Sequence, residues 1–366
     1  MSELEKTPYR LEIFTPEKSH YWDSFLEKLP YAHFFFSRTY QAHQAGRFEE
    51  ISMMVWKKNT LVALLPLNLT SENLSEKRQE KDKVKPIVAK TAISYQGLSF
   101  AGLLALPTLR YEEMAKIWVL ILRFLQAQKI QTLLYHALPD YQNNFENQAV
   151  RRIIFALGAK LVRIETSAVL DWTKELRYDS QKKRNLKKAQ KNALVIQKIV
   201  LASQKPPSFE EVEKIRIFWE ILHQNLAERH GKEPTHSFTE ILGLMQLFPK
   251  NMSLFLVEKE KKIVAGVLFF QTRTCLHAQY IASNSVGRKA FALDFLFDQI
   301  LQNPLLWDIR KGDQVPFFFS FGISQVRPSG KTNLNLLRWK EGFGTKAFLH
   351  ESYQIDLTQK IEISEI

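Results

Sequence analysis

Two kinds of hydrophobic periodicity alternate along the first half of the chain. Apolar residues at every second position predict β-strands, and apolar residues at spacings of three and four predict helices with one buried face. The predicted strands lie at 9–14, 51–69 (a hairpin), 130–138 and 159–172, and the predicted helices at 19–29, 112–128 and 147–157. Residues 1–175 therefore indicate one α/β domain.

The second half has its densest apolar pattern between Leu254 and Gly344. Two apolar strands meet at a charged turn, Glu258–Lys262, and are followed by a third strand, a helix, another strand and a short helix. This order predicts a compact α/β core, in which we expect a ligand where the loop after the third strand enters the helix. Because the first half has a similar order of elements, an internal duplication is expected.

A basic segment separates the two halves. From Arg177 to Lys198 the chain carries eight basic residues and one acid, Asp179. This composition is typical of a solvated helix that links two domains, and it also fits a basic arm that faces the phosphates of a substrate or of tRNA. The predicted parts are a first domain at 1–175, a linker at 176–200 and a second domain at 201–366.

Composition narrows the classes of protein further. The formal net charge of +13 predicts a surface that attracts nucleic acid, anionic membranes or phosphorylated small molecules. The single cysteine, Cys275, excludes an internal disulfide framework, and its apolar surroundings predict a buried thiol. No apolar run approaches the roughly 20 residues of a membrane span, and no signal peptide is recognisable, so we expect a cytoplasmic protein. The polar segment 70–86 is expected to be a surface loop.

Several common reaction classes lack their motifs in this sequence. His223, His230 and His236 lie within fourteen residues, but no HxxxH, CxxC or paired acidic ligand accompanies them, so no metal is expected. The sequence also lacks a GxxxxGK[ST] phosphate loop, a GxGxxG dinucleotide motif and a GxSxG elbow. Nucleotide hydrolysis, dinucleotide redox chemistry and serine hydrolysis are therefore disfavoured.

Polar residues stand out within otherwise apolar or glycine-marked segments. They fall at predicted strand ends and helix starts, where α/β folds bind ligands. Each also has a structural alternative: a buried Asp294 usually bonds a neighbouring loop, and Tyr280 can simply pack in a core. The candidates are Arg229, His230, His236, His277, Gln279, Tyr280, Asp294, Ser324, Asn333 and Lys340.

Residues 208–358 resemble the GNAT-fold acyltransferases. The resemblance is to the two-domain branch related to the Fem-type aminoacyltransferases of peptidoglycan synthesis, with a BioF2-like acetyltransferase domain. The motifs that carry it are RHGKEPTHS, IVAGVLFF, LHAQYIAS, ALDFL, FGIS and NxxLLRWKEGFG, and the basic arm SQKKRNLKKAQKNALVI resembles a segment that precedes the second domain in this branch. The last two motifs of the second domain, FGIS and NxxLLRWKEGFG, are the most specific.

The resemblance implies an α/β (α+β) fold of two tandem GNAT-like domains, each a mixed, mostly antiparallel sheet flanked by helices. The first domain is expected to be degenerate. Acyl-CoA, in the form of acetyl-CoA, is the implied donor. The predicted donor-binding residues are Gly287, Arg288, Lys289 and Lys340, the catalytic residues His230, His236 and Tyr280, and the acceptor-binding residues Arg229, Gln279, Asp294, Ser324 and Asn333.

The predicted function is transfer of an acyl group to an amine or hydroxyl of a small-molecule acceptor, such as a sugar or a cell-envelope (glycan) precursor. In this hypothesis a histidine is the base, since imidazole titrates near neutral pH, and Tyr280 donates to the oxyanion or the leaving group. A purely positioning role for both histidines is the alternative. At the level of function, a Fem-type aminoacyltransferase that uses charged tRNA and a non-catalytic binding protein on a GNAT scaffold remain open.

Overall fold

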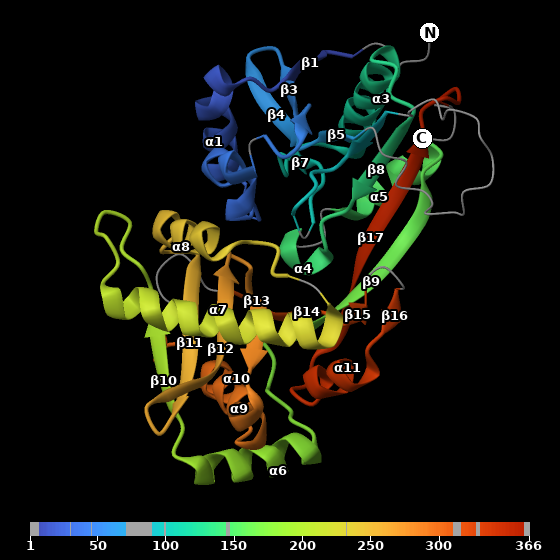
Figure 1. Ribbon diagram of the computed structural model, residues 1–366. Helices are drawn as coiled ribbons and strands as arrows, with labels where there is room; N and C mark the ends of the chain where they lie inside the picture. Colours follow the sequence, from blue (N-terminus) through green and yellow to red (C-terminus); the bar gives the residue numbers. More distant parts are fainter. Residues whose placement is uncertain are drawn as a thin grey trace, which may run out of the picture. The chain divides into compact units, whose positions relative to one another are not determined.

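The computed structural model describes the chain as two compact units (Figure 1). Unit 1 comprises Met1–Glu165 and Leu349–Ile366, and unit 2 comprises Thr166–Phe348. Strands β9 (Lys160–Asp171) and β17 (Lys346–Asp356) each begin in one unit and end in the other. The described residues are 7–361 apart from 30, 45, 71–89, 99, 144–146, 232, 310–315 and 327–329, so most of the predicted loop at 70–86 lies outside them.

The division differs from the one predicted at 175 and 200. Helix α6 (Ser180–Ala189) and strand β10 (Val195–Ile199), which fall within the expected linker, belong to unit 2. The end of the chain returns to unit 1, because β17 pairs with β8 (Thr132–His136). A strand's periodicity does not say which sheet the strand will join, and so this exchange was not predictable.

Unit 1 holds two groups of strands and a central helix. One sheet has the order β1-β3-β4-β7, and the strands of the other that lie in this unit have the order β17-β8-β6-β5-β2, with only β6 and β8 parallel among the pairs described. The elements are β1 (Tyr9–Ile13), β2 (Glu49–Glu50), β3 (Met53–Lys57), β4 (Thr60–Leu65), β5 (Asn68–Thr70), β6 (Thr91–Ile93), β7 (Leu104–Ala105), α1 (Ser19–Glu27), α2 (Arg38–Gln41), α3 (Tyr111–Ala127), α4 (Asp140–Asn143) and α5 (Asn147–Ala156).

The apolar stripe of α3 explains its place at the centre of the unit 1 core. Ile117, Trp118, Ile121 and Leu122 are fully buried in one cluster with residues of β3, β4, β8 and β17. The carboxylate of Glu113 accepts a hydrogen bond from the backbone N–H of Arg110, which satisfies one donor at the start of the helix. The helix predicted at 112–128 and the hairpin predicted at 51–69 are confirmed.

Unit 2 is built on the strand order β10-β11-β12-β13-β14-β9. Every neighbouring pair in this order is antiparallel except β13 and β14. An antiparallel pair of two-residue strands, β15 and β16, follows β14. The further elements are β11 (Met252–Lys259), β12 (Lys262–Gln271), β13 (Cys275–Ser283), β14 (Phe318–Ile323), β15 (Gln325–Val326), β16 (Lys331–Thr332), α7 (Phe209–His230), α8 (Phe238–Leu247), α9 (Ser285–Lys289), α10 (Ala292–Gln302) and α11 (Leu334–Glu341).

Helices cover both faces of this sheet. Ala265 and Val267 of β12 belong to the aromatic-rich core that contains α10. Gly266, which lies between them and so points to the opposite face, packs against α7: a Cβ at this position would lie 2.7 Å from the ring of Phe218. Glycine therefore lets the long helix α7 approach the sheet closely, and this fixes the face on which the polar residues described below are found.

Candidate functional site

The central feature of unit 2 is the point where two parallel strands part. Strands β13 and β14 pair from Cys275–Phe318 to His277–Ser320, and no further pairing between them is described. β13 continues to Ser283 and β14 to Ile323. We call the diverging segments, 278–283 and 321–323, the fork. Their facing backbone groups have no partner strand in the described register, so an extended ligand could pair with them.

A β-bulge places Tyr280 on the α7 side of the fork. The register between β12 and β13 shifts so that Leu268 faces Tyr280 and Phe269 faces Ala278, which leaves Gln279 as the extra residue. The bulge inverts the alternation of side chains: Ala278 belongs to the α10 core, whereas the ring of Tyr280 makes an edge contact with Trp219 of α7, 5.1 Å between centroids.

The structure brings together two of the predicted catalytic residues. The Nδ1 atom of His236 and the hydroxyl of Tyr280 are 2.7 Å apart, and both side chains are buried. His236 lies in the loop that follows the end of α7 at Gly231, a left-handed residue that turns the chain away from the helix axis. Burial raises the pKa of Tyr280 to about 12, so its hydroxyl keeps its proton at neutral pH.

The side chains of Arg229 and His230 lie outside the described part of the structure. Their predicted roles in acceptor binding and catalysis therefore stay predictions. His223, the third histidine of this region, contacts Glu233 through Nε2 at 2.7 Å. Among the described residues, no group of three or more His, Cys, Asp or Glu is arranged to hold a metal ion.

A second histidine marks the point where the fork begins. The Nδ1 atom of His277 lies 3.0 Å from the hydroxyl oxygen of Ser320, its partner in the last strand pair, and this oxygen also accepts the backbone N–H of Gly322. His277 was a candidate from the sequence without a defined role, and Ser320 was not among the candidates. The signal was present in FFFSFGIS, where a lone serine interrupts an apolar strand.

The predicted phosphate cradle lies just after β13. Asn284 caps α9 by accepting the backbone N–H of Gly287, and a Cβ on Gly287 would lie 2.3 Å from the carbonyl oxygen of Val264. This glycine is thus required by close packing. The guanidinium of Arg288 donates to the carbonyl of Ser283 at the end of β13, and Arg288 and Lys289 are both exposed.

Asp294 is fully engaged within the protein. It is 4% exposed, and its carboxylate accepts hydrogen bonds from Lys182 Nζ (2.6 Å), Trp339 Nε1 (2.7 Å) and Asn185 Nδ2 (3.1 Å). These contacts join α6, α10 and α11. They favour the structural alternative for Asp294 over the predicted contact with an acceptor.

The remaining candidates lie after β14. Asn333 caps α11, since its side chain accepts the N–H of Leu336. The Ser324 hydroxyl is buried and has no hydrogen-bond partner among the described residues. Lys340 is 2% exposed, and its amine donates to the carbonyls of Gly322 (2.9 Å) and Ile323 (2.7 Å). Binding of phosphate by Lys340, and of acceptor by Asn333 or Ser324, stays a prediction.

Unit 1 has a parallel strand pair too, β6 with β8, but its surroundings are different. The hydroxyl of Tyr135 on β8 accepts the N–H of Leu103, and the hydroxyl of Tyr31 bonds both backbone groups of Ala105. Side chains of unit 1 therefore occupy the backbone groups of Leu103 and Ala105. The degeneracy expected for the first domain stays a prediction.

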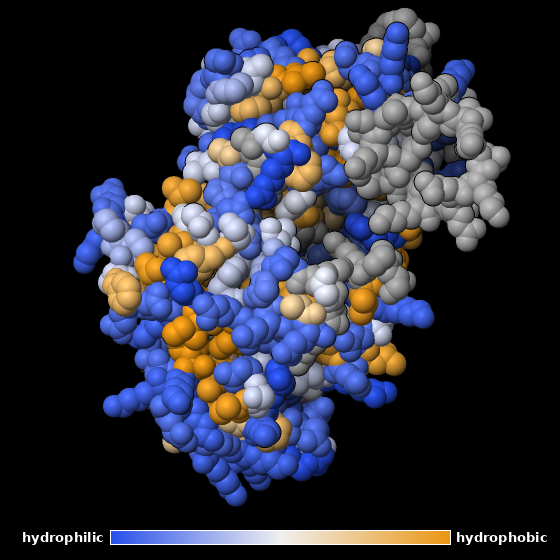
Figure 2. All heavy atoms as spheres, in the orientation of Figure 1, coloured by the Kyte–Doolittle hydropathy of each residue, from blue (hydrophilic) through white to orange (hydrophobic). Residues whose placement is uncertain are grey.

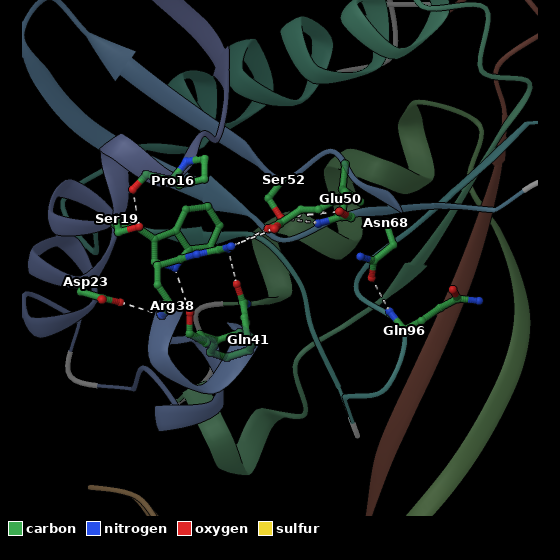
Figure 3. A network of polar contacts seen from close by, with 12 residues as sticks. Pro16, Ser19, Asp23, Arg38, Gln41, Glu50, Ser52, Asn68 and Gln96 are labelled. Atoms are coloured by element: carbon green, nitrogen blue, oxygen red, sulfur yellow. Dashed lines mark hydrogen bonds and ion pairs between the residues drawn. The ribbon is translucent and has the colours of Figure 1, made fainter. Parts of the chain in front are cut away.

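A partly buried polar network in unit 1 was not foreseen from the sequence (Figure 3). Arg38 forms two hydrogen bonds with the carboxylate of Glu50, of 2.7 and 2.8 Å, and a further one with Gln41. The guanidinium lies 3.6 Å from the ring centroid of Phe14. The charge of Arg38 is paired with Glu50, and the plane of its guanidinium lies over an aromatic ring, so the network stabilises unit 1.

Comparison with solved structures identifies the fold. No family model matches the chain, and no curated protein matches it by sequence. The structure of FemX superposes with a TM-score of 0.62 over 95% of this chain and 97% of FemX, at 11% identity. The chain has the FemX fold.

Two further structures share this FemX-like fold. L-PGS from Bacillus licheniformis superposes with a TM-score of 0.51, 12% identity and coverage of 93% of this chain and 90% of that one. A tandem GNAT protein from the clavulanic acid biosynthesis pathway superposes with a TM-score of 0.50 and 12% identity, and the match covers 96% of this chain and 99% of that one. The predicted fold of two tandem GNAT-like domains is confirmed. No described helix is both long and apolar enough to cross a membrane.

Proposed function

We propose that this protein is an acyltransferase in which the fork of unit 2 holds the acyl donor. The observation that carries the proposal is the parting of parallel strands at His277–Ser320, next to the buried His236–Tyr280 pair. The pair lies on the α7 side of the sheet, so it can reach a group held between the strands. The donor is an acyl-CoA such as acetyl-CoA, and the acceptor an amine or hydroxyl of a sugar or cell-envelope precursor.

The fork suits a donor with an extended amide-containing arm. Backbone N–H and C=O groups of 278–282, on the β13 arm, can hydrogen bond such an arm as a partner strand would, and an N–H in the fork can polarise the carbonyl that is attacked. The exposed cations Arg288 and Lys289 stand at the far end of β13, where they can pair with the donor's phosphates.

Transfer requires that the acceptor lose a proton and that the leaving thiolate gain one. We assign the first task to His236, because an imidazole nitrogen can accept a proton as a general base, and the second to Tyr280, whose hydroxyl is protonated because burial raises its pKa to about 12. The 2.7 Å contact between them can pass a proton in either direction. Gln279, the bulged residue, and Asn333 are assigned to acceptor orientation.

Thermal-shift titration with coenzyme A, acetyl-CoA and tRNA tests the proposal directly. A donor present at one hundred times its dissociation constant stabilises the protein by about 2.7 kcal/mol. We expect the coenzyme A ligands to raise the melting temperature. Failure of both coenzyme A ligands to do so would contradict acyl-CoA as donor.

Replacement of the pair tests its chemistry once turnover is found. Tyr280→Phe removes the proton donor but keeps the ring against Trp219, so we expect a loss of about 10²-fold or more in kcat with little change in donor affinity. His236→Ala is expected to lower kcat similarly. Intact turnover in His236→Ala would leave this histidine with a positioning role at most.

A second candidate donor, charged tRNA, is favoured by the outer face of α6. Lys183, Arg184, Lys187 and Lys188 are exposed and form no ion pair among the described residues. In the orientation of Figure 1 this helix forms the lower edge of unit 2, and Figure 2 shows hydrophilic residues there. The two i,i+4 pairs place positive charges one helical turn apart, as phosphate contacts require.

Removal of the positive charges on α6 distinguishes charged tRNA from acyl-CoA as the donor. The variant K183Q/R184Q/K187Q/K188Q should weaken tRNA binding and reduce its salt dependence if these cations contact phosphates. A matched control, K205Q/K250Q/K261Q/K262Q, removes four exposed charges from other elements. Equal loss in both variants, or none in either, would argue against tRNA on α6.

A further inference from the structure

The chain after β14 folds back onto the strand that it leaves. β14 is followed by the hairpin β15–β16 and by α11, and the side chain of Lys340 near the end of α11 returns to the last residues of β14. The backbone N–H of Asn333, at the start of α11, also donates to the carbonyl of Ser324. Asn333 and Lys340 therefore hold α11 against residues 322–324, at the end of the fork.

The regular strand conformation of β14 is interrupted at Gly322. Ser320 pairs with Val169 of β9 and Ile323 pairs with Ser167, so β14 has one residue more than its partner between these points. Gly322 has a φ of 72°, in the left-handed region that glycine tolerates best. In a regular strand, successive carbonyls point to opposite sides, but here the carbonyls of Gly322 and Ile323 both accept from one amine.

We propose that Lys340 is a positioning residue that holds the β14 arm of the fork away from β13 through these two carbonyls, without touching donor or acceptor. Its effect on donor binding rests on the function proposed above. Turned toward α11, the two carbonyls cannot continue the ladder with β13. The amine of Lys340 is 2% exposed and donates to two backbone carbonyls, so in this proposal it replaces the phosphate contact expected from the sequence with a contact to β14.

The two hydrogen bonds do not need a charged lysine. A neutral amine has two N–H donors, as many as the two carbonyls use, whereas pairing with a phosphate needs the ammonium. Burial lowers the pKa of Lys340 to about 7, so both forms are accessible near neutral pH. A positioning role and a phosphate contact therefore predict different pH behaviour.

Hydrogen exchange tests the proposal without any ligand. In Lys340→Met, which keeps the length of the side chain and removes both donors, the amides of 321–326 should exchange at least tenfold faster, with those of β11 and β12 unchanged. Lys346→Met, at an exposed position of β17, is the matched control. Unchanged exchange at 321–326 in folded Lys340→Met would overturn the proposal.

Donor binding is measured in parallel by calorimetric titration with coenzyme A and acetyl-CoA. We expect Lys340→Met to weaken binding at least tenfold and Lys346→Met to leave it unaltered, and the ratio of wild-type affinity to that of Lys340→Met should stay constant between pH 6 and 8.5. A ratio that falls as the pH rises through 7 would show a charge-dependent contact and refute the positioning role. If the wild type binds neither ligand, acyl-CoA fails as the proposed donor, and hydrogen exchange still decides the role of Lys340.

Gly322→Ala provides an independent variant in case Lys340→Met does not fold. Alanine is strained at a φ of 72°, and its Cβ would lie 3.4 Å from the His277 ring, so the substitution disturbs the same bend with Lys340 intact. It should reproduce both the faster exchange at 321–326 and the weaker donor binding. Wild-type values for both would contradict the importance of the bend.

Discussion

Buried charge in unit 2 is concentrated where α6, α10 and α11 meet. Lys182 and Asp294 form an ion pair with a 2.6 Å contact, and the two side chains are 3% and 4% exposed. The Lys182 amine also lies 3.7 Å from the ring centroid of Phe343. Burial lowers the pKa of Lys182, and the carboxylate of Asp294 opposes this effect. The pair stabilises the junction only while both partners are present.

Removal of one partner should therefore be far more harmful than removal of both. Asp294→Asn leaves the lysine charge buried without its counterion, and we expect a loss of about 3–5 kcal/mol in the free energy of unfolding. The double variant Lys182→Met/Asp294→Asn should recover part of this loss. Urea unfolding of the three proteins measures the effects, and a double variant no more stable than Asp294→Asn would refute the coupling.

The lowered pKa of Lys340 has a consequence for stability as the pH changes. Between about pH 7, its folded value, and about 10.5, the unfolded chain binds a proton that the folded chain does not, so this residue makes stability rise with pH. The free energy of unfolding of the wild type should therefore increase relative to that of Lys340→Met from pH 7 to pH 9, by at most about 1.4 kcal/mol per pH unit. Urea unfolding at pH 7, 8 and 9 checks this, and a constant difference would contradict it.

At the scale of elements, the local sequence was sufficient to predict the helices and strands whose formation depends on neighbouring residues. The strands of the β11–β13 meander, the capping of α7 by Ser208 and Glu211, and the stripe of α3 all follow from residues close together in the sequence. The motifs FGIS and NxxLLRWKEGFG were expected to lie near one site, and the structure brings them into contact, because Lys340 donates to the carbonyls of Gly322 and Ile323.

What could not be predicted depends on contacts between distant segments. The fork exists because residues 275–277 pair in parallel with 318–320, and no local pattern shows where such a pairing stops. The basic composition of α6 predicts a solvated helix. Lys182 is nevertheless buried, because its amine donates to the carboxylate of Asp294, which lies 112 residues later in the sequence. Gly287 was expected to approach a phosphate, and no local pattern shows that a Cβ at this position would meet the carbonyl of Val264.

At the scale of the whole molecule, residues 349–366 belong to unit 1, whose other residues come from the first half of the chain. Tyr353, Ile355 and Leu357 lie in the core cluster of unit 1, and Glu351 pairs with Arg151 of α5. The β8 strand has its register with β17 from Ser352–His136 to Asp356–Thr132. The first unit is therefore incomplete until the last residues have been synthesised.

Truncation after Phe348 should consequently unfold unit 1 and spare the core of unit 2. Burial of each large apolar side chain contributes about 1.5–3 kcal/mol, so loss of three removes about 5 kcal/mol or more, comparable with the net stability of a domain. Hydrogen exchange should show loss of protection in α3 and β8 and retained protection in β11 and β12. Truncation after Lys360, which keeps β17, is the control and should behave as the wild type; equal loss of protection in both units of the shorter protein would show that the units do not fold separately.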